Sequence, residues 1–197
     1  MSRARLSALV PALSGLLIAG GCATSSPHAA PLSVRSLALV DVSWAEGRFD
    51  ASAAVSGEEA QTSQLARALL RELGKDGAWA VTDARPPKDR PAEAAPPEAG
   101  PPAEASLSVK LLACGAWPTS SREFGREVHW YAGECTAEVV ARDAGGRTLA
   151  TLQRTGRWDS ARQDRLEGRK VQAQAVSNAV LDVAARLAAG LSPGAAR

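Results

Sequence analysis

The sequence predicts an α+β domain built from one mixed sheet of four to five strands, with two helices packed on one face. Apolar residues recur at helical spacing in two segments, whereas other segments alternate apolar and polar residues as strands do. Along the chain the order is strand, helix, strand, long loop, three antiparallel strands and helix. One sheet covered on a single face by two helices lets every element bury its apolar side.

A strand at 33–44 opens the domain. Its apolar residues occupy both faces, as is typical of a strand in the interior of a sheet. Leu37 and Leu39 lie on one face, and Ala38, Val40, Val42 and Trp44 lie on the other.

A helix follows this strand. Ser56 and Glu59 have the spacing of a capping box, in which the two side chains bond free amides of the first turn. Gly74 and Gly77 end the helix. Its apolar stripe consists of Leu65, Ala66, Leu69, Leu70 and Leu73.

A short strand at 78–83 leads into a segment rich in Pro, Ala and Glu. Residues 85–105 hold seven of the twelve prolines, and this composition buries too little apolar surface to offset the entropy of ordering. We therefore expect a disordered loop that interrupts the domain. A Pro-rich ligand for another domain is the alternative, although the basic flank usual in such ligands is missing.

Three antiparallel strands and a helix complete the domain. Strands are expected at 106–117, at 134–143 and, after a Gly-containing turn, at 147–158. The helix is expected from 160 to 189. On the first of these strands Leu107, Val109, Leu111 and Ala113 share a face. The helix has the stripe Val176, Val180, Val183, Leu187 and Leu191, supported by Val171, Ala175 and Ala179, and ends at Gly190 and Pro193.

The first 21 residues have the features of a secretory signal peptide: two arginines, no acidic residue and an apolar run. This run is too short and too interrupted for a transmembrane helix. The small residues from Ala19 to Cys22 resemble the lipobox of bacterial lipoproteins, although Ala19 stands where leucine is usual. We expect a lipid on Cys22, a tether over 22–33, the domain over 34–191 and a tail over 192–197. A plain secreted protein is the alternative.

Removal of the signal peptide leaves a chain without a charge bias. Lys plus Arg falls from 23 to 21 because two arginines are lost, and Asp plus Glu is 21. A neutral balance gives no case for nucleic-acid binding. The remaining 176 residues (197 minus 21) suffice for one domain with a real core.

Two further cysteines, Cys114 and Cys135, invite a disulfide in an exported protein. Strand alternation places them on opposite faces, and a bulge at Gly115 or Gly133 would restore the match. Bonded and free thiols therefore both stay open. Neither these cysteines nor the two histidines have the close spacing of a zinc site, and the sequence has no nucleophile, phosphate-loop or metalloprotease motif. We expect no metal, no cofactor and no catalytic residue.

Two sets of surface residues are candidates for binding. The aromatic side chains around the predicted loop 118–127 could dock a partner, or could cover the end of the core; they are Trp117, Phe124, Trp130 and Tyr131. The densest basic stretch could bind an anionic ligand, or could be a solvated face paired with Asp159, Asp164 and Glu167; it consists of Arg154, Arg157, Arg162, Arg165, Arg169 and Lys170.

The layout over residues 34–191 resembles a group of bacterial envelope lipoprotein domains. The segments that carry the resemblance are "SLALVDV", "LLRELGKDGAWAVTD", "ASLSVKLLAC", "AEVVARDAGGRTLATLQRTG" and an Ala/Val-rich last helix. The group comprises the penicillin-binding-protein activator lipoprotein, the curli-secretion lipoprotein and the N-terminal domain of the Tol-Pal translocation protein. The element order is also similar to that of the lipopolysaccharide-assembly lipoprotein, whose usual motif after the lipidated cysteine is absent here.

These resemblances imply a non-enzymatic lipoprotein of the outer membrane that faces the periplasm and works by binding. It would be an accessory or scaffold subunit of an envelope assembly, tethered to the membrane by its lipid, with an unidentified envelope protein or a second copy of itself as partner. One alternative is a lipopolysaccharide-transport protein that plugs an outer-membrane barrel. The other is an enzyme that uses Cys114 or His129. Ala23 after Cys22, rather than an aspartate, favours the outer membrane.

Overall fold

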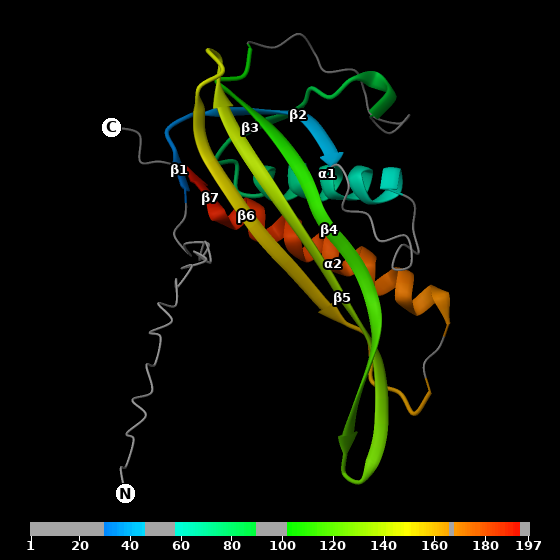
Figure 1. Cartoon of the computed structure of the whole chain (residues 1–197). Coiled ribbons are helices and arrows are strands. Elements are labelled where there is room, and N and C mark those ends of the chain that lie inside the picture. Colours follow the sequence, from blue (N-terminus) through cyan, green and yellow to red (C-terminus); the bar gives the residue numbers. More distant parts are fainter. Residues whose placement is uncertain (1–29, 46–57, 90–101, 166–167, 194–197) are drawn as a thin grey trace, which may run out of the picture.

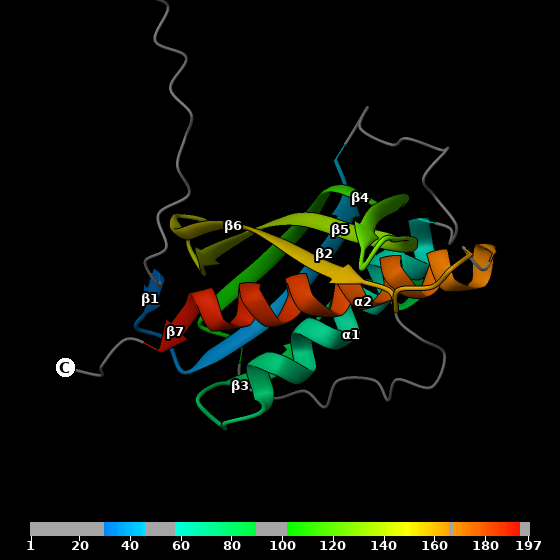
Figure 2. The same ribbon diagram turned by 90° about the horizontal axis from the view of Figure 1, so that it is seen from below.

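The chain forms a five-stranded mixed sheet in the order β3-β2-β4-β5-β6, with helices α1 and α2 on one face (Figures 1 and 2). The computed structural model describes residues 30–45, 58–89, 102–165 and 168–193. A two-stranded parallel ribbon, β1 with β7, lies beside the sheet. The predicted α+β class is therefore confirmed.

The main sheet consists of β2 (Ser36–Trp44), β3 (Ala80–Asp83), β4 (Ala105–Glu123), β5 (Arg126–Asp143) and β6 (Thr148–Asp159). The helices are α1 (Glu58–Gly74), α2 (Arg169–Gly190) and the 3-10 turn η1 (Pro87–Asp89), and the ribbon is β1 (Ala30–Leu32) with β7 (Leu191–Pro193). Strand β2 pairs in parallel with β3 and β4, whereas β4, β5 and β6 form an antiparallel meander.

The helix-facing side of the sheet and the facing sides of both helices form the core. The predicted stripes are buried in it, except that Leu191 lies in β7 rather than in the last helix and that Leu70 and Val171 are only half-buried. The core side chains contributed by α2 are Ala175, Val176, Ala179, Val180, Val183, Ala184 and Leu187. Those of α1 are Leu65, Ala66, Ala68, Leu69 and Leu73.

A β-bulge in β2 overturns the predicted division of its faces. The register with β4 shifts between Leu39 and Asp41, so Val42 and Trp44 come to lie opposite Val109 and Leu111. The extra residue inverts the alternation, so side chains in the second half of the strand lie on the face opposite to the predicted one. Val42 and Trp44 therefore pack against the core on the same side as Leu37 and Leu39.

Several predicted boundaries need correction. The last helix begins at Arg169 rather than at 160, because residues 160–163 run beside β5 and bond its backbone. The predicted disordered loop is ordered at its start, where buried Arg85 forms a 2.7 Å ion pair with Asp83 and η1 follows. The predicted tether and tail each contribute residues to the ribbon, in β1 and β7.

Four predictions concern residues outside the described part of the chain. Ser56 of the capping box lies outside it, as do residues 90–101 of the Pro-rich loop. The signal peptide and Cys22 also lie outside it.

Candidate functional site: a projecting hairpin arm

Strands β4 and β5 are longer than their neighbours and continue beyond the body of the molecule as a two-stranded arm (Figure 1). Pairing of β2 with β4 ends at Leu111, and pairing of β6 with β5 ends at Ala132. We define the hairpin arm as residues 117–131. At about 3.3 Å per residue it extends about 23 Å from Trp117 to its tip.

The prediction of a loop at 118–127 is wrong, because these residues belong to the arm. From Ala113 and Thr136 onward the two strands pair without interruption as far as Glu123 and Arg126. Phe124 and Gly125 form the two-residue turn, with φ of 49° and 80°. Positive φ at both positions is the geometry of a type I′ hairpin turn, which matches the twist of the flanking strands. The glycine was the available signal, but the polar run around it concealed the strands.

A disulfide joins Cys114 to Cys135 at the root of the arm. The two residues lie directly opposite in the ladder, because the register shifts between Leu111 and Ala113. A bulge thus brings the two cysteines to one face, as a disulfide between them requires. It lies between Leu111 and Ala113 rather than at the predicted Gly115 or Gly133. The same shift leaves Ala113 exposed instead of in the core.

The four aromatic residues of the candidate partner surface do not share one face. Trp117 pairs with Ala132 and Thr119 pairs with Trp130, so both indoles lie on the face away from the helices. Tyr131 lies on the opposite face and packs against the core. Phe124 is at the tip and fully exposed, and Trp117 is 47% exposed. In the described part of the chain these two are the exposed large apolar side chains.

Residues 160–163 brace the arm along β5. Ser160 donates its N–H to the Tyr131 carbonyl at 2.9 Å, and its hydroxyl accepts the Tyr131 N–H at 2.9 Å. Gln163 exchanges backbone bonds of 2.8 and 2.9 Å with His129. Arg162 lies over the Trp130 ring, 5.0 Å from its centroid, and forms a 3.1 Å ion pair with Glu123. The backbone bonds to Tyr131 and His129 stiffen the arm near its root against bending.

The six residues of the predicted basic patch are divided over the molecule. Arg154 lies near Gly190 at the end of α2, whereas Arg169 and Lys170 lie at its start, about 30 Å away along the helix. Arg157 forms a 2.8 Å ion pair with Glu134 on the outer face of the sheet. The remaining members are Arg162 on the brace and Arg165, which is exposed.

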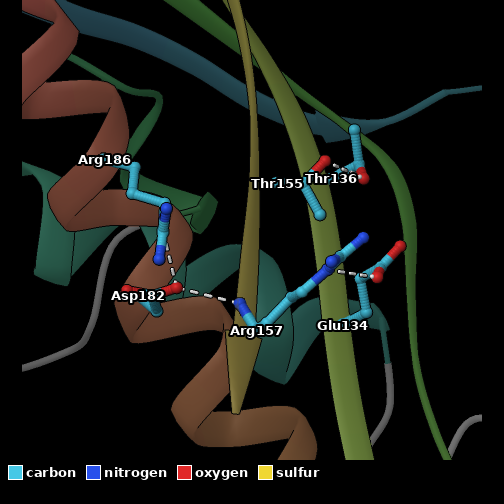
Figure 3. Close-up of polar contacts among 6 residues, drawn as sticks. All are labelled: Glu134, Thr136, Thr155, Arg157, Asp182 and Arg186. Atoms are coloured by element: carbon cyan, nitrogen blue, oxygen red, sulfur yellow. Dashed lines mark hydrogen bonds and ion pairs between the residues drawn. The ribbon is translucent and has the colours of Figure 1, made fainter.

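Sequence reasoning missed a polar network that joins α2 to β6 (Figure 3). Asp182 accepts the backbone N–H of Arg157 at 2.8 Å and the guanidinium of Arg186 at 2.7 Å. On the outer face, the hydroxyls of Thr136 and Thr155 are 2.9 Å apart. No local pattern marks these residues, because their contacts depend on how the helix crosses the strand.

The described residues contain no group of three or more His, Cys, Asp or Glu side chains that could hold a metal. The Cys114 thiol required by the enzymatic alternative is bonded to Cys135. His129 is half-buried in β5, with its backbone paired to Gln163. No helix in the described ranges is long and apolar enough to cross a membrane.

Comparison with known proteins finds no matching family model and no matching curated protein. Solved structures do show similarity. A Xanthomonas campestris protein of the DUF330 family is 13% identical, with 84% of this chain and 87% of that chain covered and a TM-score of 0.47. A minor lipoprotein from Acinetobacter baumannii is 11% identical, with 80% and 92% covered and a TM-score of 0.44.

A third structure, described as a neuraminyllactose-binding hemagglutinin homolog from Helicobacter pylori, is 10% identical, with 84% and 89% covered and a TM-score of 0.48. Similarity at this level carries no information about ligand, partner or activity.

Proposed function

We propose that the chain is a non-catalytic accessory or scaffold subunit of a cell-envelope assembly, tethered to the outer membrane through a lipid on Cys22. The observation that carries this proposal is the hairpin arm. It is stapled at its root by the Cys114–Cys135 disulfide, braced along β5 and exposes Trp117 and Phe124. Aromatic side chains on a preorganised element are well suited to contact a partner, because few degrees of freedom are lost on binding.

The disulfide supports a location outside the cytoplasm, where oxidising conditions preserve such bonds. It agrees with the signal peptide and with the lipobox-like residues before Cys22. Two or more acyl chains on that cysteine would give stable anchoring, whereas one chain gives only marginal binding. Ala23 after the cysteine supports the outer rather than the inner membrane.

The position of the arm also fits this role. Cys22 precedes Ala30 of β1 by eight positions, and eight residues span at most about 28 Å. The ribbon of β1 and β7 and the tip of the arm lie at opposite ends of the molecule (Figure 1). A lipid on Cys22 would hold the ribbon end close to the membrane and leave the arm free to contact partners.

Photo-crosslinking in cells tests the proposal. A benzoylphenylalanine at position 124 or 117 of the full chain is expected to give one dominant adduct, and the same probe at exposed Arg71 on α1 is the control. Adducts from position 71 but none from the arm would contradict the proposal. A one-to-one adduct with an outer-membrane barrel would instead support the plug alternative.

A further inference from the structure

One edge of the arm has no neighbouring strand among the described residues. Strand β2 covers β4 only as far as Leu111, and Ala45 adds one bond to the Leu111 carbonyl. Beyond that point β4 continues for twelve residues, to Glu123, paired on one side with β5. An open strand edge of this kind is a template for another strand.

The hydrogen bonds of β5 identify which groups this edge presents. The backbone groups of Tyr131 bond Ser160 and those of His129 bond Gln163, so both residues direct these groups away from β4. Their partners in the ladder, Pro118 and Ser120, therefore direct their own backbone groups away from β5, to the open edge.

By the same alternation, Ala116 and Arg122 also point to the open edge. The Ala116 carbonyl is already bonded to the Gln172 amide at 2.7 Å. Pro118 has a carbonyl but no N–H. Ser120 and Arg122 each present one N–H and one carbonyl.

We propose that this edge pairs with the same edge of a second copy of the chain, antiparallel about a two-fold axis at Ser120. In this register the two Ser120 residues exchange two hydrogen bonds. Each Arg122 N–H reaches the Pro118 carbonyl of the second copy, which adds two more. The missing N–H of Pro118 faces the Arg122 carbonyl, so every amide donor that residues 118–122 direct to the open edge has an acceptor at the joint.

The register also accounts for the exposed apolar side chains. It places Trp117 opposite Glu123 of the second copy and therefore next to Phe124 of that copy. The two large apolar residues left exposed in the described chain would thus cover one another at both ends of the joint. Arg122 lies opposite Pro118, so no like charges face each other directly.

The opposite edge of the sheet is less suited to strand addition. Along β6, Asp182 occupies the N–H of Arg157 and the Arg154 guanidinium occupies the Gln153 carbonyl at 2.9 Å. Helix α2 packs along this strand. Side chains that occupy edge groups in this way prevent further pairing.

This inference rests on the proposed function, in which the arm contacts a partner, and it identifies that partner as a second copy of the chain. Ser120→Cys in the full chain tests it, because the two cysteines would face each other as a hydrogen-bonded pair about 5.5 Å apart at Cα, within disulfide range. A reductant-sensitive dimer is expected on gels of cell membranes. Ser121→Cys, on the other face, and the unaltered chain are the controls, and both should run as monomers on the same gels because neither can form the new disulfide.

A second variant tests the backbone bonds. Ser120→Pro removes an outward N–H and is expected to abolish the dimer seen by sedimentation of the purified full chain, whereas Ser120→Ala keeps it. Proline is tolerated at an open edge, and an intact Cys114–Cys135 disulfide checks the fold.

The outcomes separate the two proposals. A Ser120→Cys adduct with a different protein would overturn self-pairing and leave the arm as the contact element. A monomeric chain that gives no adduct at 120, 117 or 124 would overturn both. Equal dimer formation by Ser120→Pro and Ser120→Ala would overturn the edge pairing alone.

Discussion

Gly156 of β6 lies so close to Val183 of α2 that a β-carbon on the glycine would overlap the Val183 amide nitrogen and the Ala179 carbonyl oxygen. The same relationship joins Gly133 of β5 to the backbone of Ala175. The helix therefore rests directly on the backbone of two adjacent strands. A side chain at either glycine would lift the helix and open the core beneath it.

Gly156→Ala is expected to lower the free energy of unfolding by about 3 kcal/mol, because overpacking against helix backbone cannot be relieved by a rotamer change. Urea unfolding followed by circular dichroism measures the change. Gly74→Ala is the matched control, since a β-carbon on Gly74 would meet no atom within 4 Å and alanine suits a helix better. Similar losses in both variants would show that the contact is not responsible.

Replacement of both Cys114 and Cys135 by alanine is expected to lower the free energy of unfolding by about 3 kcal/mol. The disulfide links residues 21 positions apart, so its removal frees a long segment in the unfolded chain. Guanidinium unfolding with and without reductant measures the effect. Reductant should bring the unaltered chain to the level of the double variant and leave the double variant unchanged; any other pattern contradicts the prediction.

Asp182→Ala is expected to speed hydrogen exchange at the Arg157 amide by about fivefold, because the loss of one hydrogen bond costs about 1 kcal/mol. Asp182→Asn keeps an acceptor oxygen and should retain most of the protection. Arg186→Ala breaks only the exposed ion pair with Asp182 and should change little. Equal acceleration in Arg186→Ala would mean that the ion pair, not the amide bond, protects this edge.

Asp143 introduces a dependence of stability on pH. The backbone N–H of Arg147 is the main cause that lowers the pKa of this carboxyl below 3.8; the Arg147 side chain and the Gly145 N–H act in the same direction, and desolvation opposes them. A lowered folded-state pKa means that the stabilisation is complete above pH 3.8 and is lost as the pH falls through the folded-state value.

Carboxyl NMR titration should therefore place the pKa of Asp143 below 3.8. Asp143→Asn, which cannot titrate, should show a shallower loss of stability below about pH 4 than the unaltered chain. A carboxyl that titrates at or above 3.8 would refute the role of the turn amides.

Cys22→Ala is expected to move the full chain from the membrane fraction to the soluble fraction of cells, because no acyl chain can then be attached. Intact-mass measurement should show the lipid on the unaltered chain and none on the variant. Ser25→Ala is the control and should stay with the membrane. Retention of Cys22→Ala at the outer membrane would refute the lipid anchor.

The sequence by itself was sufficient for the elements whose signal is local. The stripe of Val176, Val180 and Val183 specifies a buried helix, since one face must leave water whatever the partner is. The turn after Asp143 is likewise local, because its carboxylate bonds the Gly145 and Arg147 amides 3.0 and 2.9 Å away, and Gly146 supplies a φ of 80°. Alternating apolar residues were enough to predict the sheet and the α+β class.

Tertiary structure alone decided which face each half of a bulged strand presents. A single extra residue near Val40 and another at Leu112 invert the alternation, and the local sequence contains nothing that marks either position. The bulges arise because pairing across the sheet must keep Trp44 over the core and Cys114 opposite Cys135. The arm was missed for the same reason: its polar strands are stabilised by pairing with each other, and pairing between distant residues leaves no periodic trace in either one.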